Sequence, residues 1–146
     1  MKTLKESIEI RTSPEVIWDW FMDIAENYLK WHPSHIKASW ETERASEIGS
    51  ILYAEEDIDG EFLKMRSKLT NLIPNRLYRF KTVGYLKFIL AGGSFEMEPS
   101  ENGTIFTATL DFHMGKFFSK ILKKKVTQIT QHMIEEGEYL KRILEN

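Results

Sequence analysis

The sequence predicts an α+β domain in which one antiparallel sheet packs against a single long helix near the C-terminus. Three observations lead to this class. A first alternating segment is followed by two short helical segments, then by a train of short alternating segments, and finally by one long amphipathic segment. Strands that follow one another across turn-rich connections pair as antiparallel neighbours, and the change to a helical period marks a separate layer.

The N-terminal part predicts one strand and two short helices. Residues 3–10 alternate between apolar and polar side chains, as a half-buried strand does. Ser13 and Pro14 then start a helix, with Ser13 as the N-cap and Pro14 in the first turn, where its missing N–H group is not needed. Residues 24–31 predict a second short helix, which Pro33 ends.

The middle of the chain predicts six further strands. The segment 61–72 alternates most clearly, with apolar side chains such as Leu63 and Met65 on one face and basic side chains on the other. The pair Gly92–Gly93 lies inside a strand pattern and predicts a bulge. The six predicted strands are 36–43, 50–57, 61–72, 76–84, 87–98 and 104–113.

The C-terminal part predicts one helix over residues 116–144. Neither glycine nor proline interrupts the chain from Lys116 to Gly137. At about 100° per residue, the apolar side chains of this segment fall within one sector of the helix. These side chains are Phe118, Leu122, Ile129, Met133, Leu140 and Leu144.

The bulk composition narrows the functional classes. A length of 146 residues suits one domain spanning 1–146, and 42% hydrophobic with 29% charged residues is ordinary for a globular protein. A net charge of −2 gives no global preference for nucleic acid or an anionic membrane. The absence of cysteine leaves histidine and carboxylates as the strong metal ligands. With no secretory leader and no apolar run of membrane-spanning length, we expect a cytoplasmic protein without membrane insertion.

Three groups of polar residues have the chemistry of metal ligands. His132 and Glu136 are four residues apart on the predicted helix, so both side chains lie on one face and can reach one ion. His32 and His35 flank Pro33 at the end of the second short helix. An acidic segment, 55–61, contains Glu56 and Glu61, which we expect to face each other across a hairpin on the inner face of the sheet. The alternatives are, for the helix pair, a glutamate that pairs with a basic strand residue or reaches solvent at the pocket mouth, for the histidines, a pair of surface loop imidazoles, and for the acidic segment, a solvated hairpin tip.

The order of the predicted elements resembles the helix-grip fold of the START and Bet v 1-like (SRPBCC) superfamily, over the whole chain. The opening Ile8 to Trp18, in which a strand runs into Ser13-Pro14-Glu15-Val16, is similar to the usual start of that superfamily. The resemblance implies a strongly curved seven-stranded antiparallel sheet wrapped around the long C-terminal helix. It also implies a cavity for a small apolar or aromatic molecule between them.

Three motifs further resemble the metal-dependent carbon–carbon hydrolases typified by diacetylphloroglucinol hydrolase and phloretin hydrolase. The matching segments are Trp31-His32-Pro33-Ser34-His35, Glu55-Glu56-Asp57-Ile58-Asp59-Gly60 and His132-Met133-Ile134-Glu135-Glu136. This resemblance implies Zn²⁺, or another divalent transition metal, as cofactor. The ligands carried over are His35, Glu56, His132 and Glu136. Tyr28 would be a catalytic-site phenol that either supports a ligand or faces the substrate.

Two departures from that group keep alternatives open. One residue fewer separates Pro33 from the second histidine, so His32 is an alternative ligand to His35, and Glu61 is an alternative to Glu56. The chain is also considerably shorter than those hydrolases. Three functions therefore compete: a zinc-dependent hydrolase that cleaves a C–C bond in an acylated aromatic or similar apolar ketone, a non-catalytic carrier or sensor of an apolar ligand, and a metal-free polyketide cyclase or dehydratase.

Overall fold

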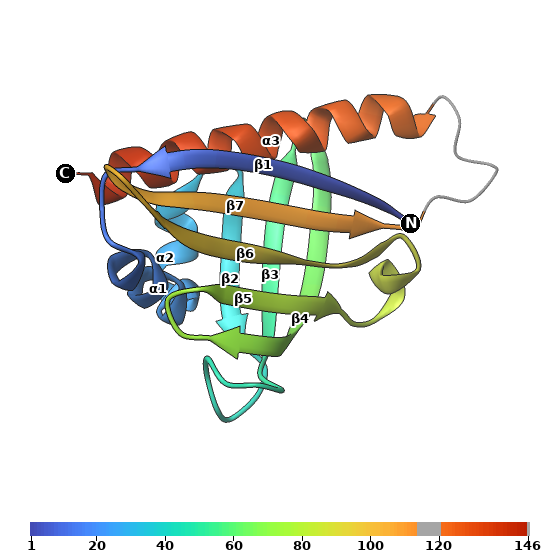
Figure 1. Cartoon of the computed structure of the whole chain (residues 1–146). Coiled ribbons are helices and arrows are strands. Elements are labelled where there is room, and N and C mark those ends of the chain that lie inside the picture. The colour runs from blue at the N-terminus through green and yellow to red at the C-terminus, as the bar shows by residue number, and fades with distance from the viewer. Residues whose placement is uncertain (114–120, 146) are drawn as a thin grey trace.

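The computed structural model describes residues 1–113 and 121–145. This part of the chain contains a seven-stranded antiparallel sheet, two short helices after the first strand, and a long helix after the last strand (Figure 1). The predicted α+β helix-grip class is therefore confirmed. In chain order the elements are β1 (Lys2–Ile10), α1 (Pro14–Met22), α2 (Ile24–Trp31), β2 (His35–Trp40), β3 (Ile51–Ile58), β4 (Glu61–Ile73), β5 (Leu77–Thr82), η1 (Tyr85–Phe88), β6 (Leu90–Ser100), β7 (Gly103–Phe112) and α3 (Ile121–Leu144).

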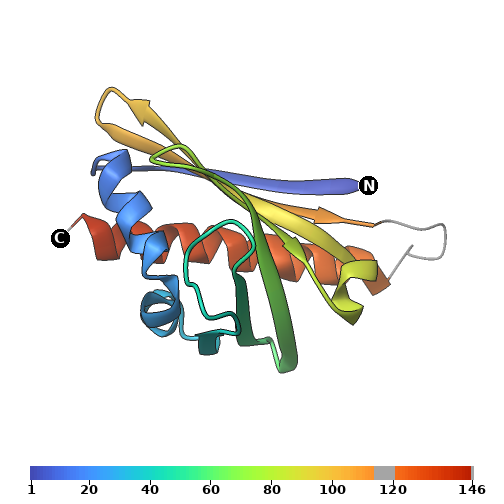
Figure 2. The same cartoon turned by 90° about the horizontal axis from the view of Figure 1, so that it is seen from below.

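The sheet curls strongly around one side of α3. Its strand order is β1-β7-β6-β5-β4-β3-β2, so β1 and β2 form the two edges. Figures 1 and 2 show that β2 and β3 run at a steep angle to β1 and β7, and that α3 lies across the concave side. Bulges help the sheet to bend, because an extra residue in one strand kinks the ladder. The predicted bulge is one of them, since the β6–β7 register shifts between Leu90 and Gly92.

The two short helices begin and end as their sequences predict. The Ser13 hydroxyl accepts a hydrogen bond from the Val16 N–H at 3.4 Å, and Pro14 occupies the first turn of α1. Asp23 separates α1 from α2, and His32 follows α2 in an extended conformation ahead of Pro33. Both helices lie near the C-terminal end of α3 (Figure 1), where α2 contacts α3 directly.

The predicted start of one strand needs correction, and the predicted start of the last helix is not tested. The predicted strand 87–98 begins only at Leu90, because Tyr85–Phe88 forms the 3-10 turn η1. Gly84 starts this turn with φ of +83°, a backbone angle that side-chain-bearing residues rarely adopt. The apolar run here has the composition of a strand, so periodicity alone could not reveal the turn. The predicted start of the last helix at residue 116 lies outside the described residues, and α3 is described from Ile121.

An aromatic cluster fills the core between the sheet and the short helices. Phe21 of α1 stacks on Phe95 of β6 at 4.5 Å and on Phe106 of β7 at 5.6 Å between ring centroids. The other large aromatic side chains divide between core and surface: Trp18, Trp20 and Trp31 are buried in this cluster, Trp40 packs against it, and Phe88 is 68% exposed.

Within residues 1–113 and 121–145, no helix has the length and apolar character needed to cross a membrane.

Candidate metal centre

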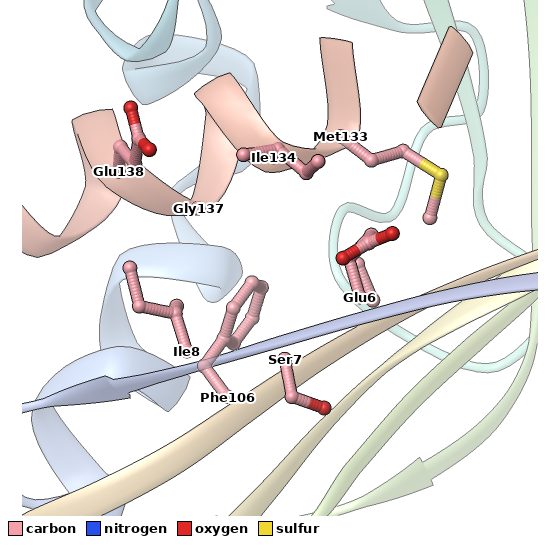
Figure 3. A pocket seen from close by; sticks show the side chains of 9 residues that line it. Glu6, Ser7, Ile8, Phe106, Met133, Ile134, Gly137 and Glu138 are labelled. Atoms are coloured by element: carbon pink, nitrogen blue, oxygen red, sulfur yellow. The ribbon is translucent and has the colours of Figure 1, made fainter. Parts of the chain in front are cut away.

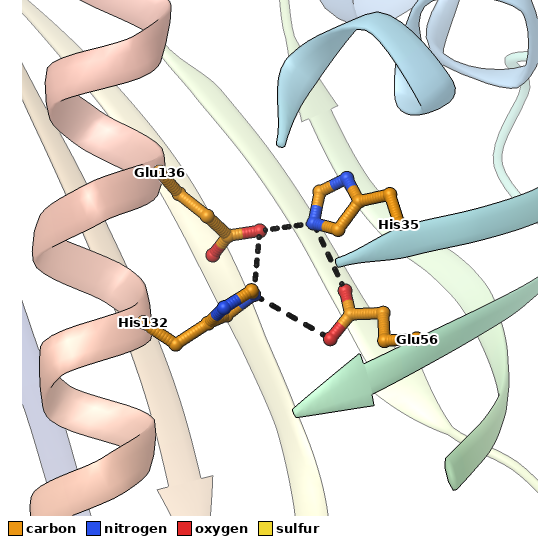
Figure 4. A group of neighbouring side chains, drawn as sticks. All are labelled: His35, Glu56, His132 and Glu136. Atoms are coloured by element: carbon orange, nitrogen blue, oxygen red, sulfur yellow. Dashed lines mark hydrogen bonds and ion pairs between the residues drawn. The ribbon is translucent and has the colours of Figure 1, made fainter. Parts of the chain in front are cut away.

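Two histidines and two glutamates converge where α2, β2, β3 and α3 meet (Figure 4). His35 is the first residue of β2 and pairs directly with Glu56 of β3 in the sheet register. His132 and Glu136 project from successive turns of α3 toward this pair. These are the four side chains carried over from the hydrolase resemblance, and three separate parts of the fold bring them together.

The donor atoms of the four side chains have the spacing of a metal-ligand set. One atom from each residue lies within 4.8 Å of the other three. Imidazoles and carboxylates alternate around the group: Glu136 Oε2 lies 2.8 Å from His35 Nε2 and 3.3 Å from His132 Nε2, while Glu56 lies 3.3 Å from His35 and 3.5 Å from His132. Ligands on a tetrahedral zinc ion are about 3.3–3.5 Å apart, given metal–ligand bonds of about 2.0–2.2 Å. The existing separations therefore need little adjustment to accept an ion.

The cluster is largely removed from solvent. The His35 side chain is fully buried, and those of Glu56, His132 and Glu136 retain 7%, 8% and 17% exposure. Burying two carboxylates this close together is costly unless positive charge accompanies them. A bound cation would supply that charge.

Both imidazoles present Nε2 to the centre of the cluster. The backbone carbonyl of Tyr28 lies 2.8 Å from His35 Nδ1, which fixes the proton on Nδ1 and leaves the Nε2 lone pair for a ligand. The Tyr28 ring also stacks on the His35 ring, with centroids 3.9 Å apart. His132 Nε2 is buried and has no hydrogen-bond partner, although two carboxylates lie near it. An orphaned buried nitrogen of this kind suits a metal ligand.

Tyr28 contacts a glutamate of the cluster. Its hydroxyl donates a hydrogen bond to Glu56 Oε1, and its ring is buried. Burial, followed by the nearby charges of Glu56 and Glu136, raises the pKa of the Tyr28 phenol well above its usual value. The phenol therefore stays protonated and positions the Glu56 carboxylate.

The cluster is electrostatically coupled. Burial raises the pKa of Glu56, and the charge of Glu136 raises it further. Burial acts in the same direction on Glu136, but His132 and His35 outweigh it and lower the pKa of Glu136 to about 2. Burial lowers the pKa of His132, yet the surrounding carboxylates, chiefly Glu136, outweigh it and raise the value to about 9. In the metal-free protein a proton on His132 thus balances part of the negative charge.

His32, the alternative ligand, lies beside the cluster with both ring nitrogens engaged. Its Nδ1 accepts the Ser34 N–H at 2.9 Å, and its Nε2 lies 3.0 Å from Glu135 Oε1. The His32 ring packs edge-on against the His132 ring, with centroids 4.5 Å apart. His32 therefore supports the wall of the cluster and offers no free lone pair to its centre.

The prediction that Glu56 and Glu61 face each other is wrong. Asp59 and Gly60 form a two-residue turn with positive φ at both positions, so Ile58 pairs with Glu61 and Glu56 pairs with Leu63. This shorter turn places Glu61 at the exposed tip of the hairpin, where it forms an ion pair with Lys125 of α3 at 3.3 Å. Glu61 is thus separated from the cluster.

One contact in the walls of the site was not predicted. The Trp31 indole N–H donates to the backbone carbonyl of Glu136 at 2.8 Å, which ties α2 to the turn of α3 that carries two cluster residues. The sequence places Trp31 directly before His32, but nothing in its spacing relates it to α3, a hundred residues later.

A small cavity lies on the neighbouring flank of the same helical turns. It has a volume of about 180 Å³ and lies between β1, β7 and α3 (Figure 3). Its walls include Ile8, Phe106 and Met133, with Glu6 and Glu138 among its polar lining. His132 and Glu136 are absent from this lining, so the cavity and the His/Glu cluster adjoin different sides of α3.

A curved sheet around a long helix, with a cavity against that helix, defines a helix-grip protein of the kind that binds small molecules. The family model described as polyketide cyclase / dehydrase and lipid transport matches residues 1–137, and the chain belongs to this family. The family description names cyclases, dehydrases and lipid transport; it does not mention hydrolases or zinc. A comparison with curated protein sequences gave no match.

Solved structures of distant sequence share the fold. Major latex-like protein 151 from Panax ginseng is 13% identical with a TM-score of 0.76, and the match covers 97% of this chain and 95% of that one. Norcoclaurine synthase from Thalictrum flavum, solved with dopamine and hydroxybenzaldehyde, is 17% identical with a TM-score of 0.74, covering 98% and 86%. A START superfamily protein from Mycobacterium smegmatis is 16% identical with a TM-score of 0.77, covering 98% and 97%.

Proposed function

We propose that this protein binds a divalent transition metal, zinc by preference, and acts as a metal-dependent hydrolase on a small apolar or aromatic ketone. The observation that carries the proposal is the convergence of His35, Glu56, His132 and Glu136, with one donor atom of each within 4.8 Å of the others in a buried setting. The family match supports a small apolar ligand as the molecule acted upon.

The donor set favours zinc over other ions. Two imidazole nitrogens and two carboxylate oxygens suit Zn²⁺, with manganese, iron and cobalt next, whereas magnesium and calcium prefer shells made only of oxygen. The contact from His35 Nδ1 to the Tyr28 carbonyl and the hydrogen bond from the Tyr28 hydroxyl to Glu56 are the supporting contacts that orient metal ligands.

A bound ion of this kind would act as a Lewis acid toward a carbonyl oxygen or lower the pKa of a water molecule. The chain's own residues hold the proposed ligands in place: Tyr28 contacts both His35 and Glu56, and the burial of the cluster limits the access of bulk water. In the proposed reaction the acyl–carbon bond of an aryl ketone breaks. Water provides the hydroxyl of the released carboxylic acid and the hydrogen that the aryl carbon gains.

A second function competes because the site has four protein ligands. Structural zinc sites are commonly closed by four protein ligands, whereas catalytic sites keep a position for water or substrate. A carrier or sensor whose zinc only stabilises the fold would have the same cluster, and the family description includes lipid transport. A metal-free cyclase or dehydratase is the third function that the family description favours.

The metal half of the proposal is tested by elemental analysis of purified protein and by calorimetric zinc titration of chelator-treated protein. We expect one zinc per chain in the wild type, none in His132→Ala, and weakened binding in Glu136→Gln. His35→Ala should lose zinc while His32→Ala retains it, because His35 Nε2 contacts the cluster carboxylates, whereas the two His32 nitrogens contact Ser34 and Glu135 outside the cluster. His113→Ala, a change at an exposed histidine, and Glu138→Gln, on the same helix, are matched controls that should bind normally.

The catalytic half is tested separately with phenols that are acylated on a ring carbon and with related aryl ketones, followed by mass spectrometry of the products. Zinc-dependent release of a carboxylic acid supports the hydrolase. Stoichiometric zinc with retention of an uncleaved apolar ligand contradicts the hydrolase and supports the carrier. If wild-type protein binds no transition metal at micromolar concentration and a chelator leaves its melting curve unchanged, both metal-based functions fail.

A further inference from the structure

Positive charge is concentrated in one continuous stretch of the chain. From Phe62 to Phe95 there is no aspartate or glutamate, although the whole chain has 22 acidic and 20 basic residues. The same stretch contains seven basic residues: Lys64, Arg66, Lys68, Arg76, Arg79, Lys81 and Lys87. The net charge of −2 therefore conceals a strongly basic region, which spans β4, β5, η1 and the start of β6.

Part of this charge lacks compensation within the protein. Lys68 of β4 pairs directly with Lys81 of β5 in the sheet, and like charges in such a position destabilise the pair. Arg66 is held by Glu41 at 2.8 Å, but Lys68, Lys81 and Lys87 form no ion pair with any carboxylate of the described residues. An external anion would relieve this repulsion.

Large apolar side chains are exposed directly beside Lys87. In η1 and the residue after it, Tyr85 is 93% exposed, Phe88 is 68% exposed and Ile89 is 43% exposed. Leu86, in the same turn, instead packs against the buried cluster that contains Leu90. Leu86 thus fixes the turn to the core, while Tyr85, Lys87 and Phe88 are exposed. The turn is drawn in yellow-green in Figure 1 and lies at one end of the sheet.

We propose that this surface docks onto a lipid bilayer that contains anionic phospholipids. The η1 patch comprises Lys68, Lys81, Tyr85, Lys87, Phe88 and Ile89. Aromatic and aliphatic side chains enter the boundary between headgroups and acyl chains, while lysines beside them attract lipid phosphates. The Lys87 ammonium lies 5.4 Å from the centre of the Phe88 ring, so charge and apolar surface are adjacent.

A bilayer fits the patch better than a nucleic acid does. Tyr85 and Phe88 could stack on bases, but the branched aliphatic side chain of Ile89 gains nothing from stacking and is best buried in an apolar phase. The docking is peripheral, since it uses one turn and two lysines on neighbouring strands. It goes beyond the proposed hydrolase and does not depend on the metal.

The test is co-sedimentation of the full chain with vesicles of phosphatidylcholine alone and of phosphatidylcholine mixed with phosphatidylglycerol. We expect binding to the mixed vesicles that weakens with added salt, and little binding to phosphatidylcholine alone. The double variant Lys81→Glu/Lys87→Glu should lose more than about tenfold in partitioning, because each lysine near an anionic surface contributes about fivefold. Phe88→Ser should lose about tenfold through lost apolar burial.

Matched controls come from surfaces distant in the sequence. Ile48→Ser removes an apolar side chain that is 67% exposed in the loop before β3, and Lys30→Glu reverses an exposed charge on α2. Both should bind like the wild type. The proposal fails if the wild type does not sediment with anionic vesicles at low salt, if the controls lose as much binding as the patch variants, or if the patch binds single-stranded RNA but no vesicle.

Discussion

At the scale of single residues, Tyr28 contacts two of the four side chains of the candidate site, His35 and Glu56. Its backbone carbonyl sets the proton position on His35, its ring stacks on the same imidazole, and its hydroxyl donates to Glu56. One residue of α2 thereby orients two of the four proposed ligands. The resemblance to carbon–carbon hydrolases implies a phenol that supports a ligand or faces the substrate, and the contacts favour the supporting role.

Tyr28→Phe separates these contributions, because it removes only the hydroxyl. The stacking and the backbone contact to His35 remain, but Glu56 loses a donor. We expect zinc affinity to fall by about 10–100-fold, as for other contacts that orient metal ligands. Calorimetric titration of zinc measures this change. Unchanged affinity would show that the hydroxyl does not orient Glu56 for a metal.

Zinc binding should release a proton from His132. The carboxylates around this residue raise its pKa to about 9 in the metal-free protein, and a metal requires the neutral imidazole. The apparent affinity should therefore rise with pH up to about 9. Titrations at neutral pH in buffers of different ionisation enthalpy count the protons released. Zero release at neutral pH would contradict a ligand role for His132.

The same pKa fixes the sign of a stability effect without metal. The folded-state value of about 9 lies above the ordinary value of 6.5, so the ion pairs of His132 stabilise the metal-free protein fully below about pH 6.5. This stabilisation is lost as the pH rises toward 9. Glu136, with its pKa lowered to about 2, contributes stability above its ordinary value of 4.5, and this is lost as the pH falls toward 2.

At the scale of elements, the cluster links the α2–β2 junction, β3 and α3. Elsewhere α3 packs on β1 and the cavity lies between them, so the cluster holds the other flank of the helix. The Trp31 indole adds a direct tie between α2 and α3 at Glu136. A metal ion would therefore act as a cross-link between elements distant in sequence.

Hydrogen exchange can detect this cross-link. We expect zinc to slow amide exchange in α3 around residues 131–140 and in β3 around Glu56, and to leave the β6–β7 pair unchanged, because no proposed ligand lies there. Mass spectrometry of protein with zinc and with chelator compares the two states. Uniform protection of the whole chain, or none, would argue against a local link.

Elements with a clear period could be predicted from the sequence, and those set by backbone geometry could not. The alternation of residues 61–72 predicted β4, and Ser13 with Pro14 predicted the start of α1. The turn η1 was missed because its residues have strand composition, while the deciding feature is the positive φ of Gly84. The position of Glu61 was wrong for a similar reason: Asp59 and Gly60 form a shorter turn than expected.

At the scale of the whole molecule, sequence motifs indicated the residues of the candidate site, but the pairing of strands that brings them together could not be predicted. Spacing placed His132 and Glu136 on one helical face, but the pairing of His35 with Glu56 depends on how β3 returns beside β2 after the loop at 41–50. That register follows from the complete sheet and cannot be read from either segment alone. The choice between His32 and His35 likewise depended on tertiary contacts, namely Ser34 and Glu135 on one ring and Tyr28 on the other.

Two parts of the molecule thus have separate proposed roles. The His/Glu cluster lies where α2, β2, β3 and α3 meet, and the η1 patch lies at the end of the sheet away from α1 and α2 (Figure 1). Because the roles use different residues, each can fail without the other.

The central claim is that the cluster is a zinc site, and anomalous diffraction tests it most directly. Crystals of protein loaded with stoichiometric zinc should show one strong peak at the zinc absorption edge, within bonding distance of His35 Nε2, His132 Nε2 and a carboxylate oxygen of both Glu56 and Glu136. Crystals of His132→Ala grown in the same way should lose this peak. A zinc peak elsewhere on the protein, or none between these four residues, would contradict the account.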